Sequence, residues 1–222
     1  MKNELTENDL IQLAKQLSCP EGQNGIKTAD MMNEGNIEMT LSSIKALNIK
    51  DGDTVLELGH GNCGHLSKIL NEANHIQYTG LEISETMKQQ ALLKNSEFIS
   101  DSTVRFNIYN GEDIPYESNT FNKIMTVNTI YFWTNPLHLF NEIYRVLKPD
   151  GLLVLSFAQK EFMEKLPFTK YGFNLFDNQK LSELIQQTKF KKVEFIEKAD
   201  VVKSKTGEIV NRLYTIAKLG KF

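Results

Sequence analysis

The chain is 222 residues long, which is enough for one α/β domain with a substantial core. Hydrophobic residues make up 41% and charged residues 24%, as in ordinary globular proteins, and no apolar run approaches the roughly 18 residues of a membrane span. The formal net charge of −3 and the lack of a basic block argue against nucleic-acid binding. Two cysteines and an N-terminus without an apolar signal core favour a soluble protein of the reducing cytoplasm.

Residues 1–50 are expected to form a helical extension ahead of the first strand. Thr6 is a typical N-cap with Asp9 as the matching capping-box acid, and the apolar face that follows ends at Cys19. We expect a flexible segment from Gly22 to Asn36, which contains three glycines and two methionines. A second amphipathic helix follows, with Ile37, Leu41, Ile44 and Leu47 on its apolar face.

The rest of the chain alternates between strand and helix patterns. Strands are predicted near 54–58, 76–81, 104–109, 123–128 and 152–157, and helices near 64–73, 85–95, 136–147 and 178–189, with Ser84 and Asp177 as N-caps. This alternation predicts right-handed βαβ units in a mainly parallel, doubly wound α/β sheet. An antiparallel hairpin is expected at the end, with a strand around Phe195, a turn at 205–208 and a return strand from Ile209 to Ala217. Without a repeat or a low-complexity linker, residues 1–222 read as one domain.

One glycine-rich corner organises the chain, between the strand Val55–Leu58 and the helix that follows. Gly59 and Gly61 can adopt positive φ, and the start of the helix offers free N–H groups to a polar or negatively charged ligand group. Gly59–Gly64 also matches the dinucleotide pattern G-x-G-x-x-G, so a nicotinamide cofactor is an alternative. Glu57 argues against it, because its carboxylate would repel a pyrophosphate and attract a positive amino group.

Five stretches in order, between residues 30 and 160, resemble the motifs of the class I S-adenosylmethionine-dependent methyltransferases. They are ELGHGNCG, with Cys63 where the family has a third alternating glycine; YTGLEIS, with Glu82; NGEDIPY, with Asn110 where Asp is usual; FNKIMTVNTIYFW; and YRVLKPDGLLVLSF. The resemblance implies a Rossmann-like sheet of seven strands with an antiparallel C-terminal hairpin. It also implies S-adenosylmethionine as the cofactor, with S-adenosylhomocysteine as the product.

The resemblance carries over to individual residues. In the family, the acid of the first motif lies near the methionine amino group, the glycines lie under the cofactor, and the acid of the second motif binds the ribose. The cofactor-binding residues that this implies are Glu57, Gly59, His60, Gly61, Asn62, Glu82, Ile83, Met87, Asn110, Gly111, Glu112, Asp113, Asn128, Thr129 and Ile130, with Met32 and Asn33 from a lid formed by the N-terminal extension. A simple packing role on the sheet is the alternative for that extension.

No catalytic residue can be assigned from the sequence, because methyl transfer from a sulfonium needs mainly positioning and requires a base only when the acceptor must lose a proton early. Tyr131 and His60 are the candidates. Tyr131 and Trp133 could shape an acceptor pocket or pack in the core, and His60 could reach a ligand or turn away. A second aromatic set could roof the acceptor site or form a small core of its own: Phe162, Phe168, Tyr171, Phe173 and Phe176.

The expected function is methyl transfer to an unidentified small molecule by a monomer or homodimer that binds neither nucleic acid nor membrane. The chain would divide into the extension 1–50, a cofactor-binding core 51–160, and an acceptor-side loop, last helix and closing hairpin at 161–222. We expect no metal site, since His60, Cys63 and His65 straddle the corner without a fourth ligand nearby. The alternatives are an NAD(P)-dependent oxidoreductase and a non-catalytic cofactor-binding regulatory protein of the same fold.

Overall fold

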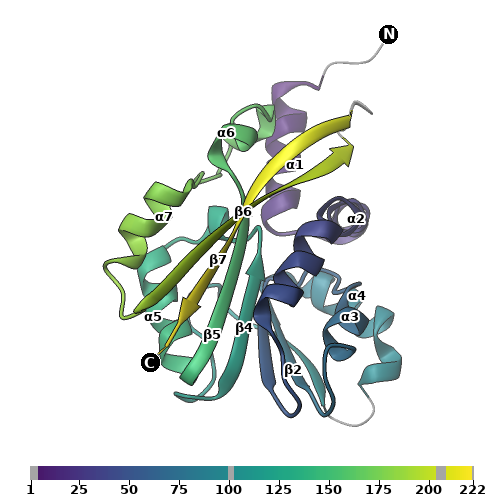
Figure 1. Ribbon diagram of the computed structural model, residues 1–222. Coiled ribbons are helices and arrows are strands. Elements are labelled where there is room, and N and C mark those ends of the chain that lie inside the picture. The colour runs from purple at the N-terminus through teal and green to yellow at the C-terminus, as the bar shows by residue number, and fades with distance from the viewer. Residues whose placement is uncertain (1–4, 100–102, 204–208, 222) are drawn as a thin grey trace.

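The computed structural model describes residues 5–99, 103–203 and 209–221, which contain a seven-stranded sheet with helices on both faces (Figure 1). The strand order is β3-β2-β1-β4-β5-β7-β6. β1 pairs in parallel with β2 and β4, β2 with β3, and β4 with β5, whereas β7 lies antiparallel between β5 and β6. The strands are β1 (Thr54–Leu58), β2 (Gln77–Glu82), β3 (Val104–Ile108), β4 (Phe121–Val127), β5 (Leu147–Ala158), β6 (Lys192–Lys203) and β7 (Ile209–Gly220). The predicted fold class, including the antiparallel hairpin, is confirmed.

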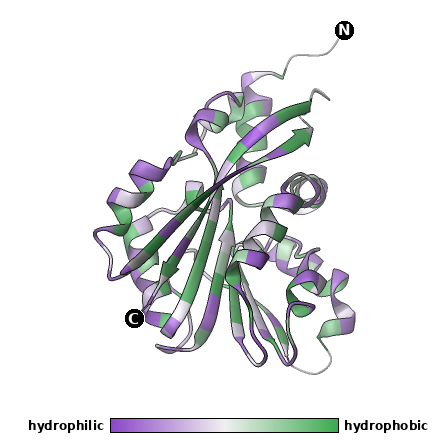
Figure 2. Ribbon diagram, in the orientation of Figure 1, coloured by the Kyte–Doolittle hydropathy of each residue, from purple (hydrophilic) through white to green (hydrophobic). Residues whose placement is uncertain are grey.

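The connection from β1 to β2 and the connection from β4 to β5 run in opposite directions along the sheet. Because both crossovers are right-handed, their helices cover opposite faces of the sheet. The α-helices are α1 (Glu7–Ser18), α2 (Gly22–Leu47), α3 (Leu66–Leu70), α4 (Glu85–Lys94), α5 (Pro136–Val146), α6 (Lys160–Met163) and α7 (Asn178–Ile185), and the 3-10 turns are η1 (Ser96–Phe98), η2 (Ile130–Phe132) and η3 (Pro167–Lys170). In Figure 2 the central strands are mainly hydrophobic, whereas the helices mix hydrophilic and hydrophobic residues, as amphipathic helices on a buried sheet should. No helix among the described residues is both long and apolar enough to cross a membrane.

Local sequence signals explain where several helices begin. Thr6 and Asp9 form the predicted capping box at the start of α1. Ser84 accepts a hydrogen bond from the backbone N–H of Met87, and Asp177 accepts one from that of Lys180, so both predicted N-caps are confirmed. The helix predicted over 64–73 is shorter than expected, since only Leu66–Leu70 is helical.

The prediction of a flexible segment from Gly22 to Asn36 is wrong, because α2 runs unbroken from Gly22 to Leu47. Gly25 does not break the helix: a Cβ there would lie 2.6 Å from the carbonyl carbon of Pro20, so glycine lets the two backbones approach closely. Ala29 is buried as well. Tertiary packing therefore outweighs the low helix propensity of the glycines. The expected turn at 205–208 lies outside the described residues.

Candidate functional site

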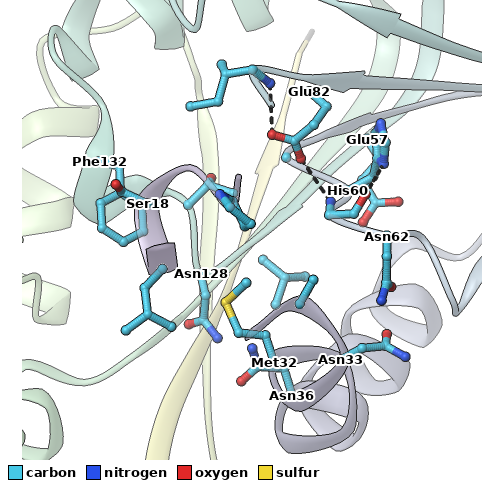
Figure 3. A pocket seen from close by; sticks show the side chains of 18 of the residues that line it. Ser18, Met32, Asn33, Asn36, Glu57, His60, Asn62, Glu82, Asn128 and Phe132 are labelled. Atoms are coloured by element: carbon cyan, nitrogen blue, oxygen red, sulfur yellow. Dashed lines mark hydrogen bonds between the residues drawn. The ribbon is translucent and has the colours of Figure 1, made fainter. Parts of the chain in front are cut away.

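A cavity opens at the carboxyl ends of β1, β2 and β4, where ligands bind in open α/β sheets (Figure 3). The N-terminal half of α2 and the end of α1 form its other wall. Of the residues implied by the motifs, those that line the cavity are Met32, Asn33, Glu57, Gly59, His60, Gly61, Asn62, Glu82, Ile83, Gly111, Asn128 and Thr129. Met87, Asn110, Glu112, Asp113 and Ile130 are not among its lining residues.

The glycine loop has the backbone geometry that its sequence predicts. Gly59 has φ +72°, and a Cβ there would lie 2.5 Å from Cγ2 of Thr129, so no larger residue fits. Gly61 has φ +57° with nothing within 4 Å of a Cβ, so a side chain there would project into open space beside the cavity. Cys63, in place of the third glycine, also has positive φ (48°) and is fully buried. The chain thus accommodates a cysteine in a left-handed conformation at this corner.

Glu82 ties the end of β2 to the glycine loop. One carboxylate oxygen accepts the N–H of Gly61 at 2.9 Å, and the other accepts the N–H groups of Ile83 at 2.8 Å and Ser84 at 3.2 Å. The side chain is 5% exposed and lines the cavity. A carboxylate offers about four acceptor positions, so these three bonds leave one for a hydroxyl group of a ligand.

Glu57 forms a buried ion pair with His65, whose Nε2 lies 2.9 and 3.0 Å from the two carboxylate oxygens, and it accepts a hydrogen bond of 2.6 Å from the hydroxyl of Tyr78. Burial opposes ionisation of Glu57, but the charge and hydrogen bond of His65 outweigh it and lower the pKa of the carboxyl. Burial likewise opposes the charge on His65, but Glu57 raises the pKa of the imidazole. The site therefore has a paired carboxylate and imidazolium at the end of β1.

Cys63 extends this network, since its Sγ lies 3.2 Å from the hydroxyl of Tyr78. The atoms of Glu57, Cys63 and His65 that could bind a metal ion lie within 4.8 Å of one another. Burial raises the pKa of the Cys63 thiol well above its usual value, which keeps it protonated. Hydrogen bonds within the network account for this grouping without an ion.

His60 is turned inward beneath the glycine loop. Its Nδ1 lies 2.8 Å from the carbonyl oxygen of Gly61, and its ring packs 4.9 Å from that of Phe106 over Gly80, where a Cβ would come within 2.5 Å of the imidazole. Burial lowers the pKa of His60, so the ring is neutral and Nδ1 carries the proton that bonds Gly61. Its buried Nε2 has no hydrogen-bond partner in the described part of the chain and can accept a hydrogen bond from a ligand.

The geometry favours the packing alternative for Tyr131 rather than a catalytic role. The side chain is buried, its hydroxyl oxygen accepts the N–H of Ala158 at 2.6 Å, and it lies 2.9 Å from Oδ1 of Asn128. Tyr131 is absent from the cavity lining, whereas Phe132 and Trp133 are part of it. The ring of Phe173 packs against Tyr131, Phe132 and Phe168, as expected of a small aromatic core.

The loop after β3 contributes Tyr109 and Gly111 to the cavity, but not Asn110. Oδ1 of Asn110 accepts the N–H groups of Glu112 and Asp113, and its Nδ2 donates to Asp113, so this side chain shapes the turn instead of facing a ligand. The replacement of Asp by Asn at this position thus preserves a turn-forming acceptor.

Several lining residues were missed by sequence reasoning, and three of them lie on α2. Ala29, Asn36 and Thr40 join Met32 and Asn33 along one side of this helix. Their spacing of three and four residues is the signal for a helix face, but it could be used only if the helix was expected to begin at Gly22. Leu17, Ser18 and Pro20 add the connection between α1 and α2 to the wall.

A family model described as "Methyltransferase domain" matches residues 56–155, which run from β1 to β5 and include the glycine loop and Glu82. The match and the methyltransferase relatives support a class I S-adenosylmethionine-dependent methyltransferase. S-adenosylmethionine is the cofactor of this family.

The curated methyltransferase relatives match a little more than half of the chain. YdaC of Bacillus subtilis, named an uncharacterized methyltransferase, is 26% identical over 119 residues, which cover 54% of this chain and 64% of YdaC. The malonyl-[acyl-carrier protein] O-methyltransferase of a Marinomonas species is 28% identical over 131 residues, which cover 58% of this chain and 46% of that protein. The chain spans less than two thirds of the length of these relatives.

Solved methyltransferase structures share the fold. Phosphoethanolamine N-methyltransferase 2 of Haemonchus contortus, bound to phosphomonomethylethanolamine and S-adenosylhomocysteine, gives a TM-score of 0.70 at 16% identity, over 94% of this chain and 60% of that one. The geranyl diphosphate C-methyltransferase of Streptomyces coelicolor, bound to Mg²⁺, geranyl diphosphate and S-adenosylhomocysteine, gives a TM-score of 0.68 at 13% identity. The match covers 94% of this chain and 87% of that one.

Proposed function

We propose that the chain transfers the methyl group of S-adenosylmethionine to a small molecule, and that the cavity beneath the glycine loop binds this cofactor. The observation that carries the proposal is the arrangement of Glu57 and Glu82, two carboxylates that end neighbouring parallel strands and line one cavity around Gly61. Carboxylates suit a ligand with an ammonium group and vicinal hydroxyls. They also disfavour the pyrophosphate of a nicotinamide cofactor.

The residues of the cavity fit the cofactor by their chemistry. Glu82 has an acceptor position left for a ribose hydroxyl, and Nε2 of His60 is an unpartnered acceptor within the described residues. Gly61 leaves open the space that a Cβ would fill. The half-exposed side chain of Ile83, together with Gly111, offers an apolar surface for a flat base. When bound, S-adenosylmethionine supplies a methyl group that its sulfonium charge has already activated.

The protein's own contribution to the reaction would be positioning and exclusion of water. We assign Met32 and Asn33 of α2 to a lid over the site, with Phe132 and Trp133 as an acceptor wall on the other side. The lid is fixed to the glycine loop, because Nδ2 of Asn62 donates to Asp30 at 2.9 Å. Fixing an acceptor in line with the methyl group can supply several kcal/mol of the barrier reduction, on the order of 7–11 in well-oriented systems.

The relatives' names do not single out one acceptor. They include a malonyl-acyl carrier O-methyltransferase, phosphoethanolamine N-methyltransferases and a sterol C-methyltransferase. We therefore propose a small-molecule acceptor and leave the methylated atom open. The free thiols of Cys19 and Cys63 suit a reducing cytoplasm, and we propose a monomer or homodimer without an observation that favours either.

Calorimetric titration tests the cofactor assignment. The protein should bind S-adenosylmethionine and S-adenosylhomocysteine with dissociation constants in the micromolar range, about −8 kcal/mol, and should give no heat with NAD. Binding of NAD without binding of either methionine derivative would favour the oxidoreductase alternative. A protein that binds the cofactor but methylates nothing in a broad acceptor screen would favour the non-catalytic alternative.

A further inference from the structure

Two asparagine side chains face each other at the end of the cavity away from Glu82. Asn36 comes from α2 and Asn128 from the loop after β4, and both line the cavity. Figure 3 shows their amide groups directed toward each other, between Glu57 on one side and Phe132 on the other. Asn128 reaches this position through a left-handed backbone with φ +57°. Asparagine is one of the few residues other than glycine that tolerates this conformation.

The orientation of both amides is fixed by partners that can only donate. Oδ1 of Asn36 lies 2.6 Å from Nη1 of Arg212, and a guanidinium has no acceptor. Oδ1 of Asn128 accepts the backbone N–H of Ala158 at 3.2 Å and also contacts the hydroxyl of Tyr131. Each amide oxygen is thus engaged, so each Nδ2 is the atom left for the cavity. Neither Nδ2 has a hydrogen-bond partner among the described residues.

Arg212 is itself held in place. It forms a buried cross-strand ion pair with Asp200, at 3.0 Å from Nε to Oδ1 and 2.5 Å from Nη2 to Oδ2, and it donates a further bond of 3.0 Å to the carbonyl oxygen of Gly35. Its contact with Asn36 therefore rests on a rigid support from the β6–β7 hairpin. No lysine or arginine is among the described residues that line the cavity.

We propose that the acceptor presents a neutral carbonyl oxygen, that of a ketone or an amide, to the paired N–H donors of Asn36 and Asn128. This inference rests on the proposed function and names the substrate class of the same site. Phe132 and Trp133 line the adjoining wall, so the carbonyl is carried on an apolar or aromatic body. An oxygen that receives two amide hydrogens is the chemical complement of this arrangement.

Two other classes of acceptor fit the site poorly. A phosphate would lack the arginine or lysine that normally binds it, because Arg212 is outside the lining and already donates to Asp200, Gly35 and Asn36. An ammonium group would direct its own N–H donors at two further donors. Among its described lining residues, the cavity therefore offers amide N–H donors but no lysine or arginine, unlike a site that binds a phosphate-bearing acceptor.

The test uses the full-length protein saturated with S-adenosylhomocysteine and four probes of similar size: acetophenone, benzoate, benzylamine and phenyl phosphate. Saturation-transfer NMR should detect binding of acetophenone, whereas benzoate, benzylamine and phenyl phosphate should bind much more weakly. Acetophenone represents a neutral carbonyl and benzoate a carboxylate, so the two also separate a neutral from a charged oxygen.

Isosteric variants isolate the two cavity-facing atoms. In Asn36→Asp and Asn128→Asp, one carboxylate oxygen still accepts from Arg212 or Ala158, while the free donor becomes an acceptor. Each change should weaken acetophenone binding by about tenfold or more, and Asn36→Asp should leave the affinity for S-adenosylhomocysteine unchanged. Asn141→Asp, on the exposed side of α5, is the matched control for the added charge and should leave acetophenone binding unchanged.

Three results would overturn the inference: preferential binding of benzoate, benzylamine or phenyl phosphate, no binding of acetophenone at millimolar concentration, or unchanged acetophenone affinity in both aspartate variants. Failure of the proposed function has a different signature. In that case S-adenosylhomocysteine itself would not bind, while the preference among the four probes could still be measured on the free protein.

Discussion

At the scale of single residues, the ion pair between Glu57 and His65 joins the strand end to the start of the following helix. Both side chains are almost fully buried, and the hydroxyl of Tyr78 completes the shell of the carboxylate. Removing one partner of a buried ion pair lowers the stability of the protein strongly, because the other charge then remains buried without a partner. Glu57 therefore has a structural role in addition to the cofactor contact proposed for it.

Replacement of His65 by glutamine should destabilise the protein in a pH-dependent way. The lowered pKa of Glu57 gives stability that is present above about pH 4.5 and is lost as the pH falls through its value in the folded protein. The raised pKa of His65 gives stability that is present below about pH 6.5 and is lost as the pH rises through its value in the folded protein. The pair thus contributes fully between about pH 4.5 and 6.5.

Urea unfolding at about pH 5.5, 7 and 9 measures this contribution. The free energy of unfolding of His65→Gln should be lower than that of the wild type by about 3 kcal/mol at the acidic pH, and the difference should shrink as the pH rises. The exposed His75 is the control position for loss of a histidine, where His75→Gln should cost much less stability than His65→Gln. A difference for His65→Gln that stays constant or grows toward pH 9 would contradict the assigned pairing.

The sequence predicts the main carboxylates of the site but not all of their partners. Gly59, Gly61 and Glu82 lie at or just after strand ends, so their location at one edge of a parallel sheet can be inferred from the motif alone. His65 contacts Glu57 only because the turn Gly61–Gly64 brings the helix start back over β1, a three-dimensional relation that no local pattern encodes. The sequence left Tyr131 between a pocket role and core packing for a similar reason, since its partner Ala158 lies on β5.

At the scale of elements, α2 combines two roles along one helix. Its second half packs on the sheet through Met39, Ile44 and Leu47, which are fully or almost fully buried. Its first half covers the cavity and is fastened at its edges by polar contacts, such as that between the Gly22 N–H and the Thr86 hydroxyl. The sequence predicted the second half, where apolar periodicity is strong. It missed the first, where glycines and a polar cavity face weaken the pattern.

Deletion of residues 1–36 should separate these two roles. The truncated protein should keep a cooperative thermal transition, because the βαβ core and the packed half of α2 lie downstream. Its affinity for S-adenosylhomocysteine should fall by about tenfold or more, because Met32 and Asn33 are lost and water enters the site. Calorimetry and thermal unfolding measured together decide the outcome. A truncated chain that does not fold would show that the extension is structural, in favour of the packing alternative.

At the scale of the whole molecule, the sheet order places the glycine loop, Glu82 and Asn128 at the carboxyl ends of three adjacent strands, β1, β2 and β4. The amino ends of the same strands carry tight turns, such as that at Gly52 before β1. A ligand site on one edge and structural turns on the other are what a doubly wound sheet produces. The central claim is that the cofactor occupies the edge that carries the glycine loop.

The most direct test compares two glycines of similar geometry at opposite ends of β1. Gly61 has φ +57° and Gly52 has φ +77°, and a Cβ at either position would have nothing within 4 Å. Gly61→Val and Gly52→Val should therefore both cost about 1–2 kcal/mol of stability through backbone strain. Calorimetric titration with S-adenosylhomocysteine should show binding abolished in Gly61→Val and retained in Gly52→Val. Normal binding by a folded Gly61→Val protein would contradict the account.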